Sequence, residues 1–219
     1  MADSEPEAGP KIVHVAPEAD VILIASKPSC QFHVSSTFLK NASPVFRALL
    51  SGPFAEGHTL CSSGTVTVSV ADEDDTATLG VLLDVLHLRY QAAPRVLPPE
   101  QFFQLAVLCD KYDCVSAVTL AADSWFRRAH RQYTDFSSRG FMAAAAAGLG
   151  MKDYFRALTA VLAYEHSTRF SELFDKENRM LDSRALRRLA VMVGLRPADD
   201  DSGAGESKMQ REAAVQASA

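Results

Sequence analysis

The run from Val21 to Ala25 constrains the fold more than any other part of this sequence, because its consecutive apolar residues have the length of a strand and must be covered by other elements. A turn at residues 27–29 leads into a second run, Gln31 to Val34, and a hairpin is the simplest pairing of the two. Residues 11–15 are rich in β-branched side chains, and residues 64–70 alternate valine with polar residues. The sequence therefore predicts a small sheet that needs a helical layer over it.

Helix signals occupy the stretches between and after these runs. Ser35-Ser36 caps a short helix that ends near Asn41, and Ser43-Pro44 caps a second one that residues 51–53 stop. Six more helices are predicted, at residues 79–90, 98–112, 115–128, 141–147, 154–164 and 183–193. The sequence thus predicts an α+β fold, in which a cluster of α-helices covers a small β-sheet and an all-α extension follows.

The predicted helices have apolar faces that supply a candidate core. Their apolar residues recur at helical spacing, which is typical of helices that bury one side. The residues of these faces are Leu79, Leu82, Leu83, Leu86, Tyr90, Phe102, Leu105, Ala106, Cys109, Tyr112, Phe155, Leu158 and Leu162. The predicted helix at 115–128 carries Val118, Leu120 and the single tryptophan, Trp125.

Composition and charge narrow the function classes. The chain has 219 residues, of which 47% are hydrophobic and 22% charged, the balance of an ordinary globular protein. Its net charge of −5 argues against a surface built to neutralise phosphates, and the arginine clusters at 127–131 and 184–188 have acidic neighbours, as solvated helix faces do. The longest uncharged apolar stretch, 140–151, is too short to span a bilayer, and residues 1–10 lack the basic start of a secretory signal. We therefore expect a protein of the cytoplasm and/or nucleus that binds neither membranes nor, directly, nucleic acid.

Two Cys/His pairs are candidate metal ligands: Cys30 with His33, and His58 with Cys61, each pair separated by two residues. Four such side chains have the chemistry of a tetrahedral zinc site. The favoured alternative is that residues 31–34 form a strand, with Phe32 and Val34 on one face and His33 on the other. The other two cysteines, at 109 and 114, fall in helical sequence and behave as small buried hydrophobes. We expect reduced thiols, no metal and no cofactor.

The acidic run from Asp72 to Asp75 has two interpretations. Paired carboxylates occur in active sites, but acidic residues directly before an apolar helix commonly cap it and interact with its dipole, and this second interpretation is favoured. The sequence also lacks the glycine loops that bind phosphates, the G-x-S-x-G elbow and the H-E-x-x-H motif. We assign no catalytic residue and do not expect an enzyme.

The order of the elements, a hairpin, two helices, a strand and three helices with a helical extension, resembles the BTB/POZ domain. Several motifs are similar to those of the family: an Asp-Val-x-Leu strand, a Phe-x-Val strand, a Ser-x-x-Phe helix and an Asp-Lys-Tyr helix end. Ser35 stands where many animal members carry a histidine, so roles tied to that position are not transferred. The signature positions are Asp20, Val21, Phe32, Val34, Ser43, Phe46, Asp110, Lys111 and Tyr112.

Within the family, the chain is most similar to the short fungal BTB proteins with a helical C-terminal extension. The resemblance divides the chain into a disordered N-terminal tail at 1–10, a BTB/POZ domain at 11–125, a helical extension at 126–196 and a disordered tail at 197–219.

The resemblance implies a protein–protein interaction module, an adaptor or scaffold with protein partners. Family members often form homodimers, some by exchanging an N-terminal strand, which Ile12, Val13 and Val15 would supply; the alternative is that these residues pair within their own chain. Other members bind the cullin scaffold of ubiquitin ligases through a hydrophobic-x-Glu element, to which Phe54-x-Glu56 is similar; the alternative is that Phe54 packs under its loop. The competing function is a transcription-associated oligomerisation scaffold without cullin binding.

Overall fold

A computed structural model describes residues 10–25, 29–51, 54–71 and 74–165. The chain divides into two compact units, Met1–Met180 and Leu181–Ala219, and every described residue belongs to the first. Residues 1–9 of the predicted N-terminal tail, the predicted helix at 183–193 and the predicted tail at 197–219 lie outside the described residues.

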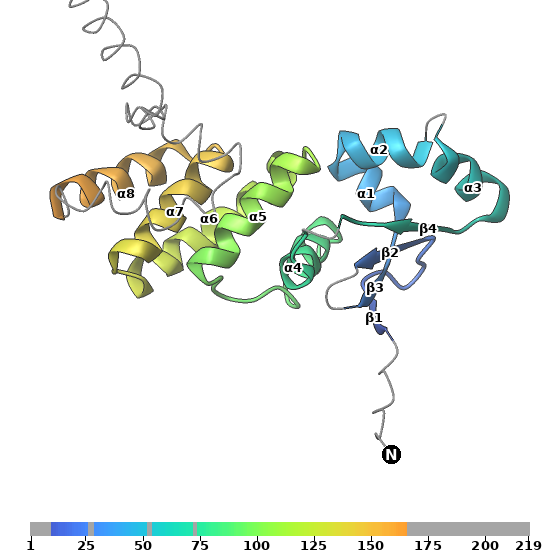
Figure 1. Ribbon diagram of the computed structural model, residues 1–219, viewed down its shortest axis with the longest axis horizontal. Helices are drawn as coiled ribbons and strands as arrows, with labels where there is room; N and C mark the ends of the chain where they lie inside the picture. The colour runs from blue at the N-terminus through green and yellow to red at the C-terminus, as the bar shows by residue number, and fades with distance from the viewer. Residues whose placement is uncertain (1–9, 26–28, 52–53, 72–73, 166–219) are drawn as a thin grey trace, which may run out of the picture. The chain divides into compact units, whose positions relative to one another are not determined.

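The described residues form a mixed α+β structure, a four-stranded sheet with eight helices (Figure 1). The α+β prediction is therefore confirmed at the level of fold class. In chain order the elements are β1 (Lys11–His14), β2 (Val21–Ala25), β3 (Cys30–Val34), α1 (Ser36–Ala42), α2 (Pro44–Ser51), α3 (Ala55–Ser63), β4 (Val66–Ser69), α4 (Thr76–Leu86), α5 (Pro99–Lys111), α6 (Val115–Gln132), α7 (Phe136–Gly148) and α8 (Lys152–Glu165).

The sheet has the strand order β1-β3-β2-β4. Strands β2 and β3 pair in antiparallel fashion, with Val21 opposite Val34 and Ala25 opposite Cys30, so the predicted hairpin is confirmed. Strand β1 pairs in parallel with β3, and β4 in parallel with β2. Both edges of the sheet are thus short strands joined in parallel to the central hairpin.

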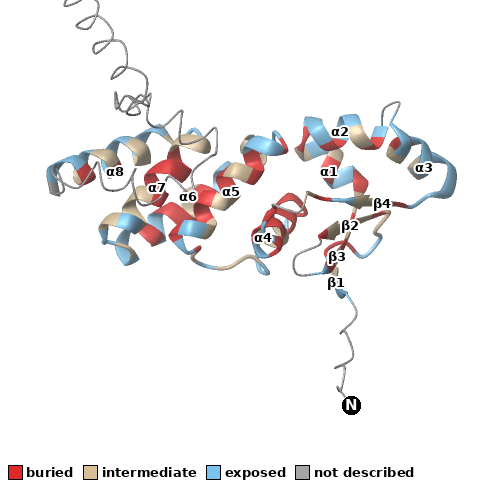
Figure 2. Cartoon of the chain, viewed as in Figure 1, coloured by how far each residue is buried: buried red, intermediate tan, exposed pale blue. Residues whose placement is uncertain are grey.

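The two faces of the hairpin differ in burial. Alternate side chains of β2 and β3 are buried, and those between them are half-buried, as the period of a strand requires. Helix α4 covers the buried face (Figure 2, where α4 is largely red) and comes close to it at Gly80, where an added Cβ would lie 3.3 Å from the Phe32 ring. Glycine at this position lets the helix approach the sheet.

One residue of the predicted apolar faces, Tyr90, is exposed instead. It is 51% exposed because α4 ends at Leu86, and the left-handed backbone of Leu88 (φ 60°) turns the chain away from the helical course. The prediction that Tyr90 lies on the apolar face of this helix was wrong. In α6, Leu120 is 83% exposed because the buried stripe runs through Val118, Ala122 and Trp125 and does not include position 120.

Helix α3 was not predicted, so three helices rather than two precede β4. Its sequence carries one large apolar residue, the half-buried Leu60, and therefore shows no helical periodicity. The helix ends at Gly64, whose left-handed backbone (φ 74°) is favourable for glycine, and whose N–H donates to the Leu60 carbonyl.

Helices α5 to α8 continue the same hydrophobic core. The rings of Phe102 and Phe126 lie 4.2 Å apart between α5 and α6, and Phe103 contacts Phe141 of α7. Helix α6 runs through residue 125, where the sequence predicts the first domain to end, and buried residues on both sides of it share one cluster. None of the helices described is long and apolar enough to cross a membrane.

Candidate protein interaction site

The start of α3 presents the predicted partner-binding pair. Phe54 has an extended backbone (φ −74°, ψ 154°) directly before the helix, and its side chain is 52% exposed. Glu56 lies in the first turn and is half-buried. A carboxylate in the first turn of a helix is favoured by the helix dipole, so Glu56 has a structural role available as well.

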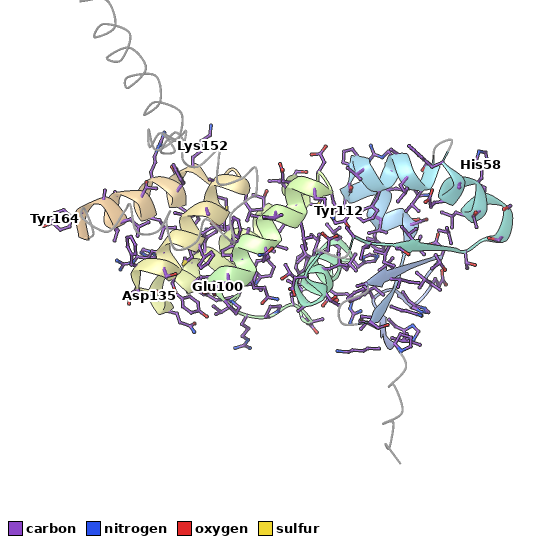
Figure 3. The ribbon with its side chains drawn as sticks, viewed as in Figure 1. His58, Glu100, Tyr112, Asp135, Lys152 and Tyr164 are labelled. Carbon is purple, nitrogen blue, oxygen red and sulfur yellow. The ribbon has the colours of Figure 1, made fainter. Side chains whose placement is uncertain are left out.

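A shallow hollow of about 440 Å³ lies between α3 and β4. Glu56 lines it together with Ala55 and Thr59 of α3 and residues 65–67 at the start of β4. Phe54 is not among the residues that line it, so the apolar side chain stands beside a polar hollow rather than inside it. His58 of the same helix does not line the hollow, and its ring points outward from α3 (Figure 3).

Strand β1 carries Ile12 and Val13, two of the residues predicted for strand exchange, and the third, Val15, directly follows it. Val13 pairs opposite Phe32 and is half-buried, Ile12 is 53% exposed, and Val15 is buried with its N–H donating to the His33 carbonyl at 2.9 Å. In this structure β1 pairs with β3 of its own chain, at one edge of the sheet.

The signature residues of β2 and β3 are structural. Val21, Phe32 and Val34 are buried in the core. The Asp20 carboxylate accepts hydrogen bonds from the backbone N–H and the hydroxyl of Ser36, both at 2.6 Å. This carboxylate ties the entry of β2 to the first turn of α1.

The remaining signature residues join α2 to the end of α5. The Ser43 hydroxyl donates to the Tyr112 carbonyl and accepts from the Phe46 N–H at 3.1 Å, so it also caps α2. The rings of Phe46 and Tyr112 stack 4.8 Å apart, nearly parallel at 9°. Tyr112 lies at the C-terminal end of α5 (Figure 3). Asp110 of the same motif is exposed.

The acidic run before α4 divides into two roles. Asp75 accepts from the Thr78 N–H at 2.8 Å and caps α4, which confirms the capping prediction. Asp74 is buried and accepts from Lys111 Nζ and from the Tyr112 hydroxyl, both at 2.7 Å. This second role could not be predicted from the sequence, because both partners lie more than 35 residues away.

The Cys/His pairs do not form one site. Cys30 is buried in β3, whereas His58 and Cys61 are exposed on α3. Within the described ranges, no three His, Cys, Asp or Glu side chains are grouped so that they could hold a metal ion. Cys109 and Cys114 are buried, and the hydrogen bond between them together with burial raises the pKa of the Cys109 thiol.

His87 is a buried histidine that the sequence did not single out. The Ser35 N–H donates to its Nε2 at 3.0 Å, and its Nδ1 lies 2.8 Å from the Leu83 carbonyl, so the ring is fixed as a neutral imidazole with its proton on Nδ1. Burial is the main cause that lowers the pKa of His87. One side of the ring faces Phe38, which is 39% exposed on α1.

No protein-family model matches the chain, and a search of curated proteins found no relative.

Proposed function

We propose that this chain is a protein–protein interaction module of the BTB/POZ type that acts as an adaptor or scaffold, with a cullin of the ubiquitin ligases as its candidate partner. Two features support the proposal: the order of strands and helices, and the use of the signature residues to join β2 to α1 and α2 to α5. The chemistry of the described residues also favours binding over catalysis, because the acidic run caps a helix and forms a buried ion pair.

The observation that carries the cullin proposal is the half-exposed Phe54 beside Glu56 at the start of α3. An aromatic side chain with about half of its surface in water is available as an anchor for an apolar pocket, and a neighbouring carboxylate fixes the orientation of the partner. Phe54 directly precedes the helix and Glu56 lies in its first turn, so their separation is set before binding and little ordering cost remains.

The test is calorimetric titration of the full chain with the N-terminal domain of the BTB-binding cullin. We expect micromolar or tighter binding by the wild type. The Phe54→Ala, Glu56→Ala double variant should bind at least 30-fold more weakly, since loss of a central anchor costs about 2 kcal/mol or more.

A matched control removes the same two kinds of group from another surface. In the Leu120→Ala, Glu100→Ala double variant, the exposed apolar residue is on α6 and the carboxylate in the first turn of α5. This control should bind the cullin domain like the wild type, and thermal melts should show that both variants are folded. Absence of binding by the wild type, or equal loss in both variants, would refute the cullin contact.

The edge position of β1 favours a second function, an oligomerisation scaffold without cullin binding. Ile12 is 53% exposed on a strand that, among the described residues, has a hydrogen-bonded neighbouring strand on one side only. Such an edge is a template for pairing or exchange with a second chain. Sedimentation of the wild type and of the Val13→Pro variant tests this function. A wild-type dimer that becomes a folded monomer in the variant supports it, and a wild-type monomer at all concentrations contradicts it.

A further inference from the structure

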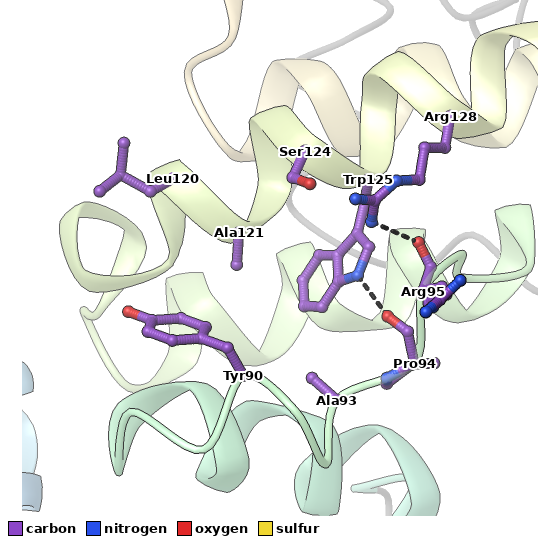
Figure 4. Close-up of a pocket in the computed structure, with 9 residues that line it drawn as sticks. All are labelled: Tyr90, Ala93, Pro94, Arg95, Leu120, Ala121, Ser124, Trp125 and Arg128. Atoms are coloured by element: carbon purple, nitrogen blue, oxygen red, sulfur yellow. Dashed lines mark hydrogen bonds between the residues drawn. The ribbon is translucent and has the colours of Figure 1, made fainter.

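A groove of about 480 Å³ lies between the loop after α4 and residues 120–128 of α6 (Figure 4). Most of its lining is apolar, and the two ends differ in chemistry. Leu120 and Tyr90 stand at one end, Arg95 and Arg128 at the other, and the indole of Trp125 lies between them. These residues belong neither to the start of α3 nor to β1, so the groove is separate from both surfaces discussed above.

Hydrogen bonds to the backbone fix the wall of the groove. Trp125 Nε1 donates to the Pro94 carbonyl at 2.7 Å, and Arg128 Nη1 donates to the Arg95 carbonyl at 3.0 Å. Both bonds tie the loop to α6, so the groove exists before any partner arrives. A preformed groove lowers the ordering cost of binding.

Among the described residues, the two arginines of the groove have no acidic partner. No described carboxylate lies within ion-pair distance of Arg95 or Arg128, whereas the neighbouring Arg127 is paired with Asp123 at 2.6 Å. The described residues that line the groove include no acidic one. On a chain with a net charge of −5, two uncompensated guanidinium groups at one end of an apolar groove favour an anionic ligand that also has an apolar part.

We propose that this groove binds a short extended peptide of a partner protein, with an apolar side chain over Leu120 and Tyr90 and an Asp or Glu carboxylate on Arg95 and Arg128. Leu120 and Arg128 are eight positions apart on α6, which is about 12 Å along the helix. An extended peptide covers that distance in about four residues. The recognised pattern is therefore an apolar residue and an acidic residue separated by two to four positions.

The lining favours a peptide over a nucleic acid. A nucleic acid is held mainly by several phosphate contacts, and the described lining of this groove offers only two guanidinium groups, one of which already donates to a backbone carbonyl. Apolar side chains and backbone make up most of the remaining wall, which suits an aliphatic or aromatic anchor.

The experiment uses the full chain and a phage-displayed library of random dodecapeptides. Enriched peptides are synthesised and titrated into the protein, with the fluorescence of Trp125 as the signal, because it is the only tryptophan in the chain. Each peptide is compared with a version in which Asp or Glu is replaced by Asn or Gln. We expect the apolar and acidic pattern among the enriched peptides, and at least tenfold weaker binding of the amide versions.

Two groove variants and one matched control complete the test. Arg95→Glu and Leu120→Ser should each weaken binding at least tenfold, whereas Arg131→Glu, the same charge change on an exposed residue of α6 outside the groove, should change it less than twofold. The Phe54→Ala, Glu56→Ala variant should bind the peptides normally, so the groove and the cullin contact are tested separately.

Four results would overturn the proposal. The first two are an enriched set of peptides without acidic residues, and equal peptide binding by Arg95→Glu and the wild type. The other two are wild-type binding of a fluorescent single-stranded oligonucleotide that Arg95→Glu abolishes, and wild-type self-association that Leu120→Ser abolishes. The last two would assign the groove to nucleic acid or to a second copy of the chain.

Discussion

The buried contact between Asp74 and Tyr112 yields a prediction whose size follows from the structure. The side chain of Asp74 is 4% exposed, and its carboxylate accepts from the Tyr112 hydroxyl and from Lys111 Nζ. Tyr112→Phe deletes one hydrogen bond to a buried carboxylate and leaves the ring stacked on Phe46. The substitution therefore isolates the hydroxyl from the packing of the ring.

The expected cost is about 2 kcal/mol of unfolding free energy. Hydrogen bonds to charged groups contribute roughly 1.5–3 kcal/mol, and loss of one partner leaves a buried acceptor less satisfied. Lys111 remains as a second partner of Asp74, with a third of its side chain exposed, and this keeps the expected value below the upper end of the range. For a urea m-value of about 2 kcal/mol/M, the midpoint should fall by about 1 M.

The assay is urea unfolding followed by Trp125 fluorescence, with Tyr90→Phe as the matched control. Tyr90 is half-exposed, and its hydroxyl makes no hydrogen bond with any other described residue, so this control should change the free energy by less than about 0.5 kcal/mol. In an Asp74→Ala background, Tyr112→Phe should cost at least 1 kcal/mol less than in the wild type, because the charged acceptor is gone. Equal effects of the two tyrosine substitutions, or no coupling with Asp74, would refute the reasoning.

Three further predictions concern burial. Burial lowers the pKa of His87, so the stability that the neutral ring contributes is present above the unfolded pKa of about 6.5 and is lost as the pH falls below that value. Between pH 7.5 and 5.5, the wild type should therefore lose more unfolding free energy than the His87→Gln variant. The difference should be at most about 1.4 kcal/mol per pH unit. Of the four thiols, Cys61 alone should react rapidly with a thiol reagent in the native chain, and all four should react in denaturant. Leu82→Asp should abolish the cooperative thermal transition, because it puts an unpaired charge at a position with 0% exposure; a wild-type melt would show that the residue does not face the core.

The sequence predicted the strands and the long helices because their signals are local. Alternation in Val66 to Val70, the continuous run of Val21 to Ala25 and the spacing of Leu79, Leu82 and Leu83 each follow from which side of an element is buried. The same local reasoning was wrong at Tyr90, where it extended a periodicity past the real end of α4.

Long-range contacts explain what the sequence did not predict. Asp74 and Lys111 are far apart in the chain, and nothing beside either residue indicates that they pair. Helix α3 has too few apolar residues to show a period, and α2 and β4 on either side fix its place. The groove beside Trp125 joins a loop to a helix about 30 residues later, so its two arginines look in the sequence like ordinary surface charges.

The structure also separates the residues that carry the family resemblance from those available to a partner. The polar groups of Asp20, Ser43 and Tyr112 form hydrogen bonds within the chain. The residues that carry the resemblance therefore hold the elements of the fold together. Binding requires side chains with surface still in water, and Phe54 and Leu120 meet that condition on different elements. An adaptor needs two surfaces that act independently, because occupation of one must leave the other free. The start of α3 and the groove on α6 share no lining residue, so each set of variants should weaken binding of its own partner and leave binding of the other unchanged.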